Sequence, residues 1–447
     1  MAGFGFILDV LRKRRQFRTR EYWSRQRLDD HLRDSLQSLR RYAYDNSRFY
    51  QQFHKGLYDA PLEELPVVTK AMMMDRLDEL VTDRDIRLQD IKAYMEDEQR
   101  PERFLGRYVI NATSGSGGQM GVSIFSNSEW ATLMASAFAR TPLKLSFTHR
   151  NKTAQVASTT AFHMSTQGGS TFRSLFMPIM MLPATEPLTS MLEKLNKWQP
   201  DTLVLYASIG RILADEQLAG HLSIAPHTVM SGSEVLTDET RRHMVQAWGD
   251  RIYNNYAATE GVAAIECEEH RGMHVMEDLA IVENVDRNNR PVPAGVYGDK
   301  LLVTILFKYI QPLIRYEIED RVRFTDELCS CGRPFRLIDS IQGRVQEILS
   351  FSSASGGSVS VHPLVFHNIM DTLPVSGWQV VQEVDGLHIL LAGVRGVIDD
   401  KRLESLLREA LASQGAVVPH VEIQRIPSIP QTITGKTSLV KSNVACG

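Results

Sequence analysis

A regular alternation of strand and helix patterns over residues 153–255 constrains the fold of this chain most. Strand-like runs occur at 153–159, 202–206, 227–230 and 251–255, and helical patterns lie between them near 190–198, 209–218 and 238–248. Alternation of this kind favours a parallel sheet covered by helices. Such sheets bind ligands in loops at the carboxyl ends of their strands, and residues 231–234 and 256–261 occupy such positions here.

The segments after this alternation predict two further parts. Short alternating runs at 280–285, 300–307, 313–324 and 335–341 indicate antiparallel β structure. The tail combines strand patterns at 378–384, 387–392 and 420–426 with an amphipathic helix at 399–413. We therefore expect an α/β protein with an N-terminal domain over 1–342, in which a β-rich subdomain covers about 262–342, and a small α+β C-terminal domain over 343–447.

Composition excludes several classes of partner. The formal charge of −3 and the absence of a long basic block beyond Arg12–Arg20 give no electrostatic footprint for nucleic acid. No apolar run approaches the roughly 18 residues that a membrane-spanning helix needs. Four cysteines in 447 residues do not make a disulfide framework, so we expect a reducing, cytoplasmic setting.

A loop rich in glycine and hydroxyl residues lies at 111–121, between strand-like runs at 107–110 and 122–125. Glycine reaches positive φ easily, so such a loop can turn several backbone N–H groups toward one point, and Thr113, Ser114 and Ser116 add hydroxyl donors. This composition suits a polyphosphate. It differs from the common P-loop, because no Gly-Lys-Ser/Thr follows and the next segment predicts a strand. A flexible hairpin loop is the alternative interpretation.

Three cysteines and two histidines form a candidate metal site. Cys267 precedes His270 and His274 in one segment, and Cys329 and Cys331 follow in a later one. Three thiolates and one imidazole suit tetrahedral Zn²⁺, and a site that uses all four positions is structural. We favour His274 as the fourth ligand and keep His270 as its substitute. The alternative is a set of reduced, buried cysteines with a surface histidine.

Several short motifs occur in a fixed order along the chain. After the glycine-rich loop come Thr259-Glu260, Arg315-Tyr316 with Asp320, Gly343-Arg344 and finally Lys436. One such motif alone is a weak signal, but the ordered set runs from Thr113 to Lys436 and so covers nearly the whole chain. In this set the chain resembles the adenylate-forming enzymes, in the branch of phenylacetate–CoA ligase and coenzyme F390 synthetase-like proteins with their capsule-cluster relatives.

The resemblance implies a nucleotide site. The loop residues Thr113, Ser114, Gly115, Ser116, Gly117 and Gly118 would hold the β- and γ-phosphates of ATP. Ser233 and Glu234 would pack against the adenine, with Tyr256 in the same nucleotide-binding set. Asp320 would accept both ribose hydroxyls, because a carboxylate offers two acceptor oxygens. Arg344 would lie beside the hinge of a mobile C-terminal lid domain.

The resemblance also implies which residues take part in catalysis. Thr259 would bind the α-phosphate, and Glu260 would hold Mg²⁺, a hard cation that prefers carboxylate oxygen. Lys436, carried by the C-terminal domain, would bring positive charge to the carboxylate and the α-phosphate as charge builds up during attack. Phe162, His163 and Tyr206 are candidates for contacts to the acid, although aromatic residues in such places are more often part of the core.

The chain departs from the family pattern in three places. The chain has Gly117 and Gly118-Gln119-Met120 where the family usually has threonine and then Gly-Lys-Pro. Glu319 replaces the usual glycine before the ribose-binding Asp320, and Gln346 replaces the acidic hinge residue, with Glu347 adjacent. These departures affect the expected catalytic rate and domain rotation more than nucleotide binding.

The reaction that the resemblance implies is ATP-dependent adenylation of a small aryl or related acid, followed by acyl transfer to a thiol, most often that of CoA. One alternative is transfer of the acyl group or AMP to an amine, a hydroxyl or a carrier protein. Another is a non-catalytic nucleotide-binding protein, which the altered phosphate loop favours. The resemblance is also compatible with a homodimer.

Overall fold

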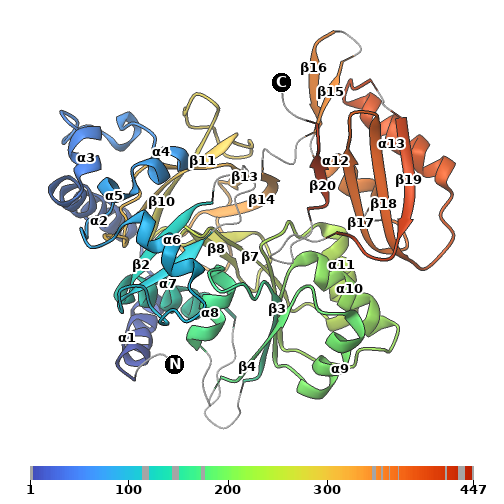
Figure 1. Cartoon of the computed structure of the whole chain (residues 1–447), viewed down its shortest axis with the longest axis horizontal. Helices are drawn as coiled ribbons and strands as arrows, with labels where there is room; N and C mark the ends of the chain where they lie inside the picture. Colours follow the sequence, from blue (N-terminus) through green and yellow to red (C-terminus); the bar gives the residue numbers. More distant parts are fainter. Residues whose placement is uncertain are drawn as a thin grey trace. The chain divides into compact units, whose positions relative to one another are not determined.

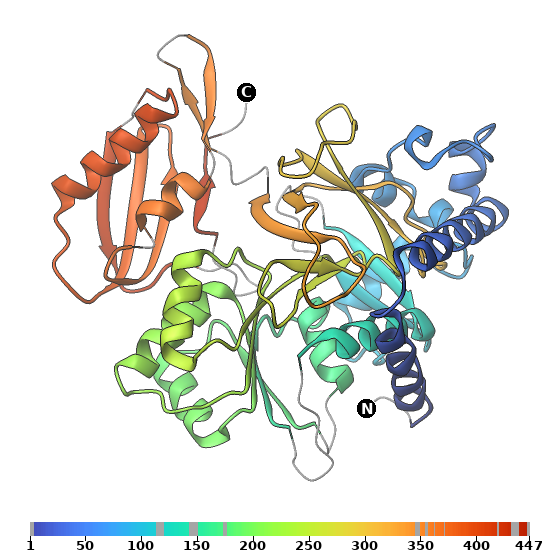
Figure 2. The same cartoon turned by 180° about the vertical axis from the view of Figure 1, so that it is seen from behind.

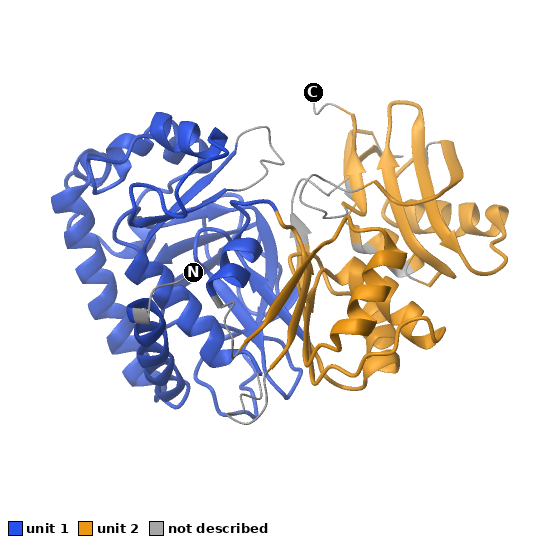
Figure 3. Ribbon diagram, turned by 60° about the horizontal axis from the view of Figure 1, so that its bottom comes forward, with its two compact units in different colours: residues 1–145, 160–174, 253–340 blue, residues 146–159, 175–252, 341–447 orange. Residues whose placement is uncertain are grey.

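The computed structural model describes most of the chain. Its described residues are 4–112, 120–142, 151–172, 177–344, 349–353, 356–361, 363–370, 372–417, 420–430 and 438–444. The chain divides into two compact units (Figure 3). Unit 1 comprises residues 1–145, 160–174 and 253–340, and unit 2 comprises residues 146–159, 175–252 and 341–447. The expected domains 1–342 and 343–447 stay a prediction.

The predicted parallel sheet lies in unit 2. Its strands are β3 (Thr153–Ala157), β4 (Ile179–Pro183), β5 (Thr202–Leu205) and β6 (Thr228–Gly232), which run parallel in the order β6-β5-β3-β4. The helices α9 (Leu188–Trp198), α10 (Ala207–Leu218) and α11 (Asp238–Trp248) pack against it through buried Leu195, Leu213 and Met244 (Figure 2). The helix-covered parallel sheet is therefore confirmed. Strand β4 was not predicted, because its methionine-rich sequence lacks a strand pattern.

The tail of unit 2 is a small α+β unit, as predicted. It contains β15 (Leu349–Ser352), β16 (Ser358–Val361), α12 (Pro363–Met370), β17 (Val375–Gln382), β18 (Gly386–Val394), α13 (Asp400–Ser413), β19 (His420–Ile426) and β20 (Val440–Ser442). The four-stranded sheet has the order β19-β18-β17-β20 (Figure 1). Asp399 caps α13 by accepting from the amides of Lys401 and Arg402. The buried stripe Leu403, Leu407 and Leu411 packs α13 into the core of this tail.

Unit 1 begins with helices and a β-hairpin. Its helices are α1 (Phe4–Arg20), α2 (Arg25–Asn46), α3 (Arg48–Phe53), α4 (Lys70–Asp75), α5 (Leu77–Leu80), α6 (Leu88–Glu96), α7 (Asn127–Arg140) and α8 (Met164–Phe172), with a 3₁₀ turn at Leu62–Glu64. The hairpin pairs β1 (Tyr108–Ala112) with β2 (Val122–Ser126) antiparallel. Ser126 and Glu129 form a capping box at the start of α7. Among the described helices, none is both long and apolar enough to cross a bilayer.

The predicted β-rich region lies mainly within the residues of unit 1. Strands β7 (Ile252–Ala257), β8 (Ala263–Glu266), β9 (Met273–Val275) and β14 (Leu337–Arg344) pair antiparallel in this order. A second antiparallel set contains β10 (Ala280–Val285), β11 (Lys300–Ile305) and β12 (Tyr316–Ile318). The run predicted as β structure over 313–324 contains two strands. It divides at Glu319 into β12 and β13 (Asp320–Thr325), because these two strands belong to different sheets.

The packing of α13 yields a stability prediction. Replacing fully buried Leu407 by alanine should lower the free energy of unfolding of the tail by about 2–5 kcal/mol, because the change leaves a cavity. Leu406→Ala is the matched control, since Leu406 is 42% exposed, and it should cost under about 0.5 kcal/mol. Hydrogen exchange of the β18 amides measures both. Equal protection in the two variants would contradict this account of the tail core.

Candidate functional site

Part of the predicted nucleotide site lies outside the described residues. This applies to Thr113, Ser114, Gly115, Ser116, Gly117 and Gly118 of the glycine-rich loop and to Lys436, while Arg344 is described only as the last residue of β14. The strands on either side of the loop are described. Ala112 pairs with Val122, and Asn111 pairs with Ser123, so the loop connects two antiparallel strands rather than a strand and a helix.

The turn that carries Thr259 and Glu260 connects β7 to β8. The Ala258 amide donates to the Val262 carbonyl at 2.9 Å, and the Gly261 amide donates to the Ala258 carbonyl at 3.0 Å. Gly261 has φ of +116°, a conformation that side-chain-bearing residues rarely adopt. A tight turn of this kind presents Thr259 and Glu260 at a defined place on unit 1.

Glu260 is held through both its side chain and its main chain. The hydroxyl of buried Tyr316 donates to the Glu260 carboxylate, and burial followed by the charge of Glu260 raises the pKa of Tyr316. The ammonium of Lys308 donates to the Glu260 carbonyl oxygen at 3.4 Å. Two residues from outside the turn therefore hold Glu260, Tyr316 at the carboxylate and Lys308 at the main-chain carbonyl.

Tyr256 and Asp320 come together in unit 1. The Tyr256 hydroxyl donates to Asp320 Oδ2 at 2.7 Å, although the two residues are 64 positions apart in sequence. Asp320 is only 8% exposed and stands at the start of β13. This contact unites two of the residues predicted to bind the nucleotide. The structure thus gives Asp320 a fixed orientation.

The predicted residues of unit 2 hold its strand ends together. Ser233, just after β6, has φ of +65°, and the Glu234 carboxylate accepts from the Ser208 amide at 2.9 Å at the start of α10. Tyr206 is buried, and its hydroxyl accepts from the Ser158 amide at 2.8 Å. These contacts connect the ends of β3, β5 and β6. The role of Tyr206 in acid binding stays a prediction.

Phe162 and His163 lie beside the strand that leads into the glycine-rich loop. The Ala112 amide donates to the Phe162 carbonyl at 2.9 Å, and the Phe162 ring stands 4.8 Å from the guanidinium carbon of Arg100. His163 Nδ1 contacts the Ser165 hydroxyl at 2.6 Å at the start of α8. The segment that contains both aromatic residues is thereby attached to β1.

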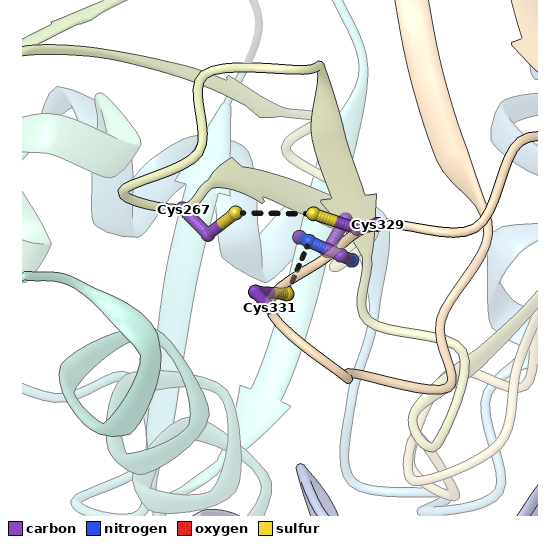
Figure 4. Close-up of side chains that lie close together, drawn as sticks. Cys267, Cys329 and Cys331 are labelled. Carbon is purple, nitrogen blue, oxygen red and sulfur yellow. Dashed lines mark hydrogen bonds between the residues drawn. The ribbon is translucent and has the colours of Figure 1, made fainter.

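Four possible zinc ligands converge in unit 1. The donor atoms of Cys267, His274, Cys329 and Cys331 all lie within 4.8 Å of one another. Figure 4 shows the three thiols directed toward a common centre. Cys267 Sγ is 3.6 Å from Cys329 Sγ, and Cys331 Sγ is 3.3 Å from His274 Nε2. His270 lies outside this group, because its Nδ1 is 3.5 Å from the Glu266 carboxylate.

The chemistry of these donors fits a zinc ion. Burial raises the pKa of Cys267 to about 12 and lowers the pKa of His274 to about 4, so without a metal both groups are neutral at pH 7. His274 Nδ1 lies 3.3 Å from the Phe335 carbonyl oxygen. A carbonyl there selects the tautomer with a proton on Nδ1 and leaves Nε2 as the ligand atom. Zinc ligation would deprotonate the thiols.

Lys308 is the site residue that sequence analysis missed. It is fully buried, its ammonium donates to Ser123 Oγ, and it stands 4.3 Å from the centroid of the Phe125 ring. Burial lowers the pKa of Lys308 to about 7, although the charges of Glu129 and Glu260 oppose this shift. Its signal in the sequence is one charge within the apolar run 305–310.

Comparison with known proteins finds related ligases. No family model matches the chain. It is 28% identical over 202 residues to phenylacetate-coenzyme A ligase of Thermus thermophilus, covering 43% of this chain and 44% of that protein. It is 24% identical over 264 residues to the protein CapK of Staphylococcus aureus, and the match covers 58% of this chain and 56% of CapK. The chain thus matches about half the length of these curated relatives.

Solved structures share the fold. A 2-hydroxyisobutyryl-CoA ligase in complex with 2-HIB-AMP has a TM-score of 0.74 at 16% identity, covering 95% of this chain and 91% of that one. The anthranilate CoA ligase AuaEII in complex with anthranoyl-AMP has a TM-score of 0.53 at 18% identity, covering 74% and 65%. At these identities the likeness establishes the fold, which these ligases have in common with this chain.

The lowered pKa of Lys308 predicts a pH-dependent stability difference. The folded pKa of about 7 lies below the value of about 10.4 for an unfolded lysine, so the unfolded state binds more protons between these values. The free energy of unfolding should therefore rise with pH across this window in the wild type. In Lys308→Met this contribution should be absent. Urea denaturation of both proteins at pH 7 and pH 9 measures the change in the free energy of unfolding with pH. An equal change in the wild type and in Lys308→Met would contradict the lowered pKa of Lys308.

Proposed function

Because this chain is similar in sequence to phenylacetate-coenzyme A ligase and in fold to adenylate-forming CoA ligases, we propose that it activates a carboxylic acid with ATP and transfers the acyl group to a thiol, that of CoA. The observation that carries the proposal is the Tyr256–Asp320 contact beside the turn of Thr259 and Glu260, all within unit 1. The similarity to phenylacetate-coenzyme A ligase supports the same reaction class. A small aryl or related acid is the proposed substrate.

The reaction proceeds in two steps. A carboxylate oxygen attacks the α-phosphorus of ATP, the bond to the β-phosphate oxygen breaks, and pyrophosphate leaves with both electrons of that bond. The thiolate then attacks the acyl carbon of the acyl-AMP and AMP leaves. A carboxylate has a poor leaving group, so a thiolate cannot displace it directly. The first step converts it into a mixed anhydride, in which AMP is a good leaving group.

Asp320 is proposed to orient the ribose. A carboxylate offers about four acceptor positions, so Asp320 can accept from the Tyr256 hydroxyl and from both ribose hydroxyls. Ser233 and Glu234 would pack against the adenine. A nucleoside bound in this way would have its α-phosphate beside Thr259. These residues would then raise the reaction rate by positioning the substrate, without taking part in bond making or breaking.

Phosphate binding is assigned to the glycine-rich loop and Glu260. The backbone amides and hydroxyls of Thr113, Ser114 and Ser116 would hold the β- and γ-phosphates. Magnesium ions are usually held by one or two carboxylates together with substrate phosphates, and the carboxylate of Glu260, fixed by Tyr316, fits that requirement. When bound, Mg²⁺ supplies charge neutralisation for the leaving pyrophosphate. Lys436 would stabilise the charge that develops at the attacked phosphorus.

Pyrophosphate release tests the proposed reaction. The purified protein should release pyrophosphate with ATP, Mg²⁺ and one or more members of a panel of aryl and short-chain acids, and with CoA it should form the thioester. Release without thioester formation would favour an amine, hydroxyl or carrier-protein acceptor. ATP binding with no acid-dependent release would favour a non-catalytic nucleotide-binding protein.

Lys436 provides a prediction about the first step. Lys436→Ala should slow pyrophosphate release by about 100-fold, the effect of removing one donor that stabilises a developing charge. The dissociation constant of ATP should stay within about twofold, because the lysine acts only as the bond to pyrophosphate breaks. Lys441→Ala, in β20 of the same tail, is the control and should behave as wild type. Normal adenylation by Lys436→Ala would refute the assignment.

Asp320 provides a prediction about nucleotide binding. Asp320→Ala should weaken ATP binding by about 10- to 100-fold, since hydrogen bonds to a charged group contribute about 1.5–3 kcal/mol. Tyr256→Phe should weaken it less, because it removes only the bond that orients the carboxylate. Asp326→Ala, an exposed aspartate after β13, is the control. Isothermal titration calorimetry measures all three, and unchanged affinity in Asp320→Ala would refute the ribose assignment.

We also propose that Cys267, His274, Cys329 and Cys331 bind one structural Zn²⁺ ion. The convergence of their donor atoms supports this proposal. The low cysteine count of the chain supports the further proposal of a reducing, cytoplasmic setting. Elemental analysis should find about one zinc per chain, retained in His270→Ala and lost in Cys331→Ser. Loss of zinc in His270→Ala with retention in His274→Ala would assign the ligand to His270 instead.

A further inference from the structure

Lys308 is a buried ammonium whose contacts are unusual for its charge. It has no exposed surface, and its neighbours are the Ser123 hydroxyl, the Glu260 carbonyl oxygen at 3.4 Å and the face of Phe125 at 4.3 Å. Burying an ammonium group is costly, and lysine is almost never fully buried unless it is paired. Within the described part of the chain, no carboxylate lies within hydrogen-bonding distance of the Lys308 ammonium, so packing alone does not account for a lysine at this position. The contacts of this ammonium group indicate a role in the neighbouring site.

The contacts of Lys308 join two parts of the proposed nucleotide site. Ser123 lies in β2 opposite Asn111 of β1, and these two strands flank the glycine-rich loop. Glu260 lies in the turn between β7 and β8. One ammonium group therefore bridges the hairpin of the proposed phosphate loop and the turn of the proposed magnesium carboxylate.

The segment that carries Lys308 is itself rigidly held. The Glu129 carboxylate accepts from the Tyr309 amide at 2.6 Å and from the Ile310 amide at 3.0 Å, which attaches residues 309–310 to the start of α7. A Cβ atom on Gly261 would stand 3.3 Å from the Phe307 ring, so the turn packs directly on this segment. The backbone on both sides of Lys308 is therefore held in place, and so is the origin of the side chain that contacts Glu260.

We propose that Lys308 is a positioning residue that fixes the Glu260 turn to β2 and so holds the Glu260 carboxylate ready for Mg²⁺. Lys308 acts on the main-chain carbonyl of Glu260, while the Tyr316 hydroxyl orients the carboxylate itself. With both held, the metal meets a carboxylate that needs no reorganisation. This inference rests on the proposed function, because it presumes that Glu260 serves a metal–nucleotide complex.

Metal affinity tests the proposal independently of turnover. Binding of Mn²⁺, as a paramagnetic probe for Mg²⁺, is measured by electron paramagnetic resonance in the presence of ATP. Lys308→Met should bind Mn²⁺ about tenfold more weakly than wild type, since the hydrogen bond that holds the Glu260 turn is lost. Lys300→Met is the matched control: it also removes a lysine of unit 1, one that pairs with Glu317 at 2.6 Å, and its affinity should be unchanged.

Two further measurements separate positioning from a merely structural role. Excess Mg²⁺ should restore the rate of pyrophosphate release in Lys308→Met, because the defect lies in the apparent KM for Mg²⁺ rather than in kcat. Lys308→Gln, which keeps an N–H donor, should show a smaller loss of affinity and decides the matter if the methionine variant does not fold. An unchanged Mn²⁺ affinity in a folded variant would overturn the proposal.

The same measurements distinguish failure of the inference from failure of the proposed function. If wild type binds Mn²⁺ and ATP but releases no pyrophosphate with any acid, the adenylation reaction is refuted, while weaker Mn²⁺ binding in Lys308→Met still supports the positioning role. If wild type releases pyrophosphate and Lys308→Met needs no extra Mg²⁺, the positioning role alone is refuted. If wild type binds no Mn²⁺ with ATP, both are refuted.

Discussion

The burial of one ammonium group sets the geometry of the site in unit 1. A buried polar group with no access to water must keep its hydrogen-bond partners in place, because each partner that moves away leaves the group unsatisfied in a medium of low dielectric constant. Lys308 therefore fixes Ser123 and the Glu260 carbonyl relative to each other. Since these residues belong to β2 and to the turn after β7, Lys308 connects the hairpin to the turn. The hydrogen bond between Tyr256 and Asp320 extends this fixed arrangement to β13.

Much of the fold could be predicted from the sequence because its signals are local. The alternation in 153–255, the Ser126/Glu129 spacing and the helix at 399–413 each depend on residues close together in the chain, and the structure contains the corresponding elements. The site was harder to predict, because its contacts join distant segments. Residues 256 and 320, or 123 and 308, meet only after the strands have paired, and no spacing in the sequence reveals this. Lys308 looked like an ordinary charge until its burial was known.

The position of His274 in the cysteine and histidine group depends on a glycine in the connection before it. This glycine allows β9 to pair with β14, which is distant in sequence. Gly272, in the connection between β8 and β9, has φ of +138°, and a Cβ atom there would stand 2.7 Å from the Ile338 carbonyl oxygen. Only glycine lets this connection approach β14 so closely. The approach places His274 opposite Leu337, in the strand that ends at Arg344. His274, one of the possible zinc ligands, therefore lies opposite the first residue of β14, the strand that precedes the tail in sequence.

Glu319 stands where the family that the sequence resembles usually has glycine, and its exposure differs from that of its neighbours. Tyr316, Ile318 and Asp320 are buried, whereas Glu319 is exposed, as expected for side chains that alternate between the two sides of an extended segment. A larger side chain at this position extends away from Asp320 and leaves the contact to the Tyr256 hydroxyl intact. The contact that orients the Asp320 carboxylate comes from Tyr256, while Glu319 stands at an exposed position of the same segment.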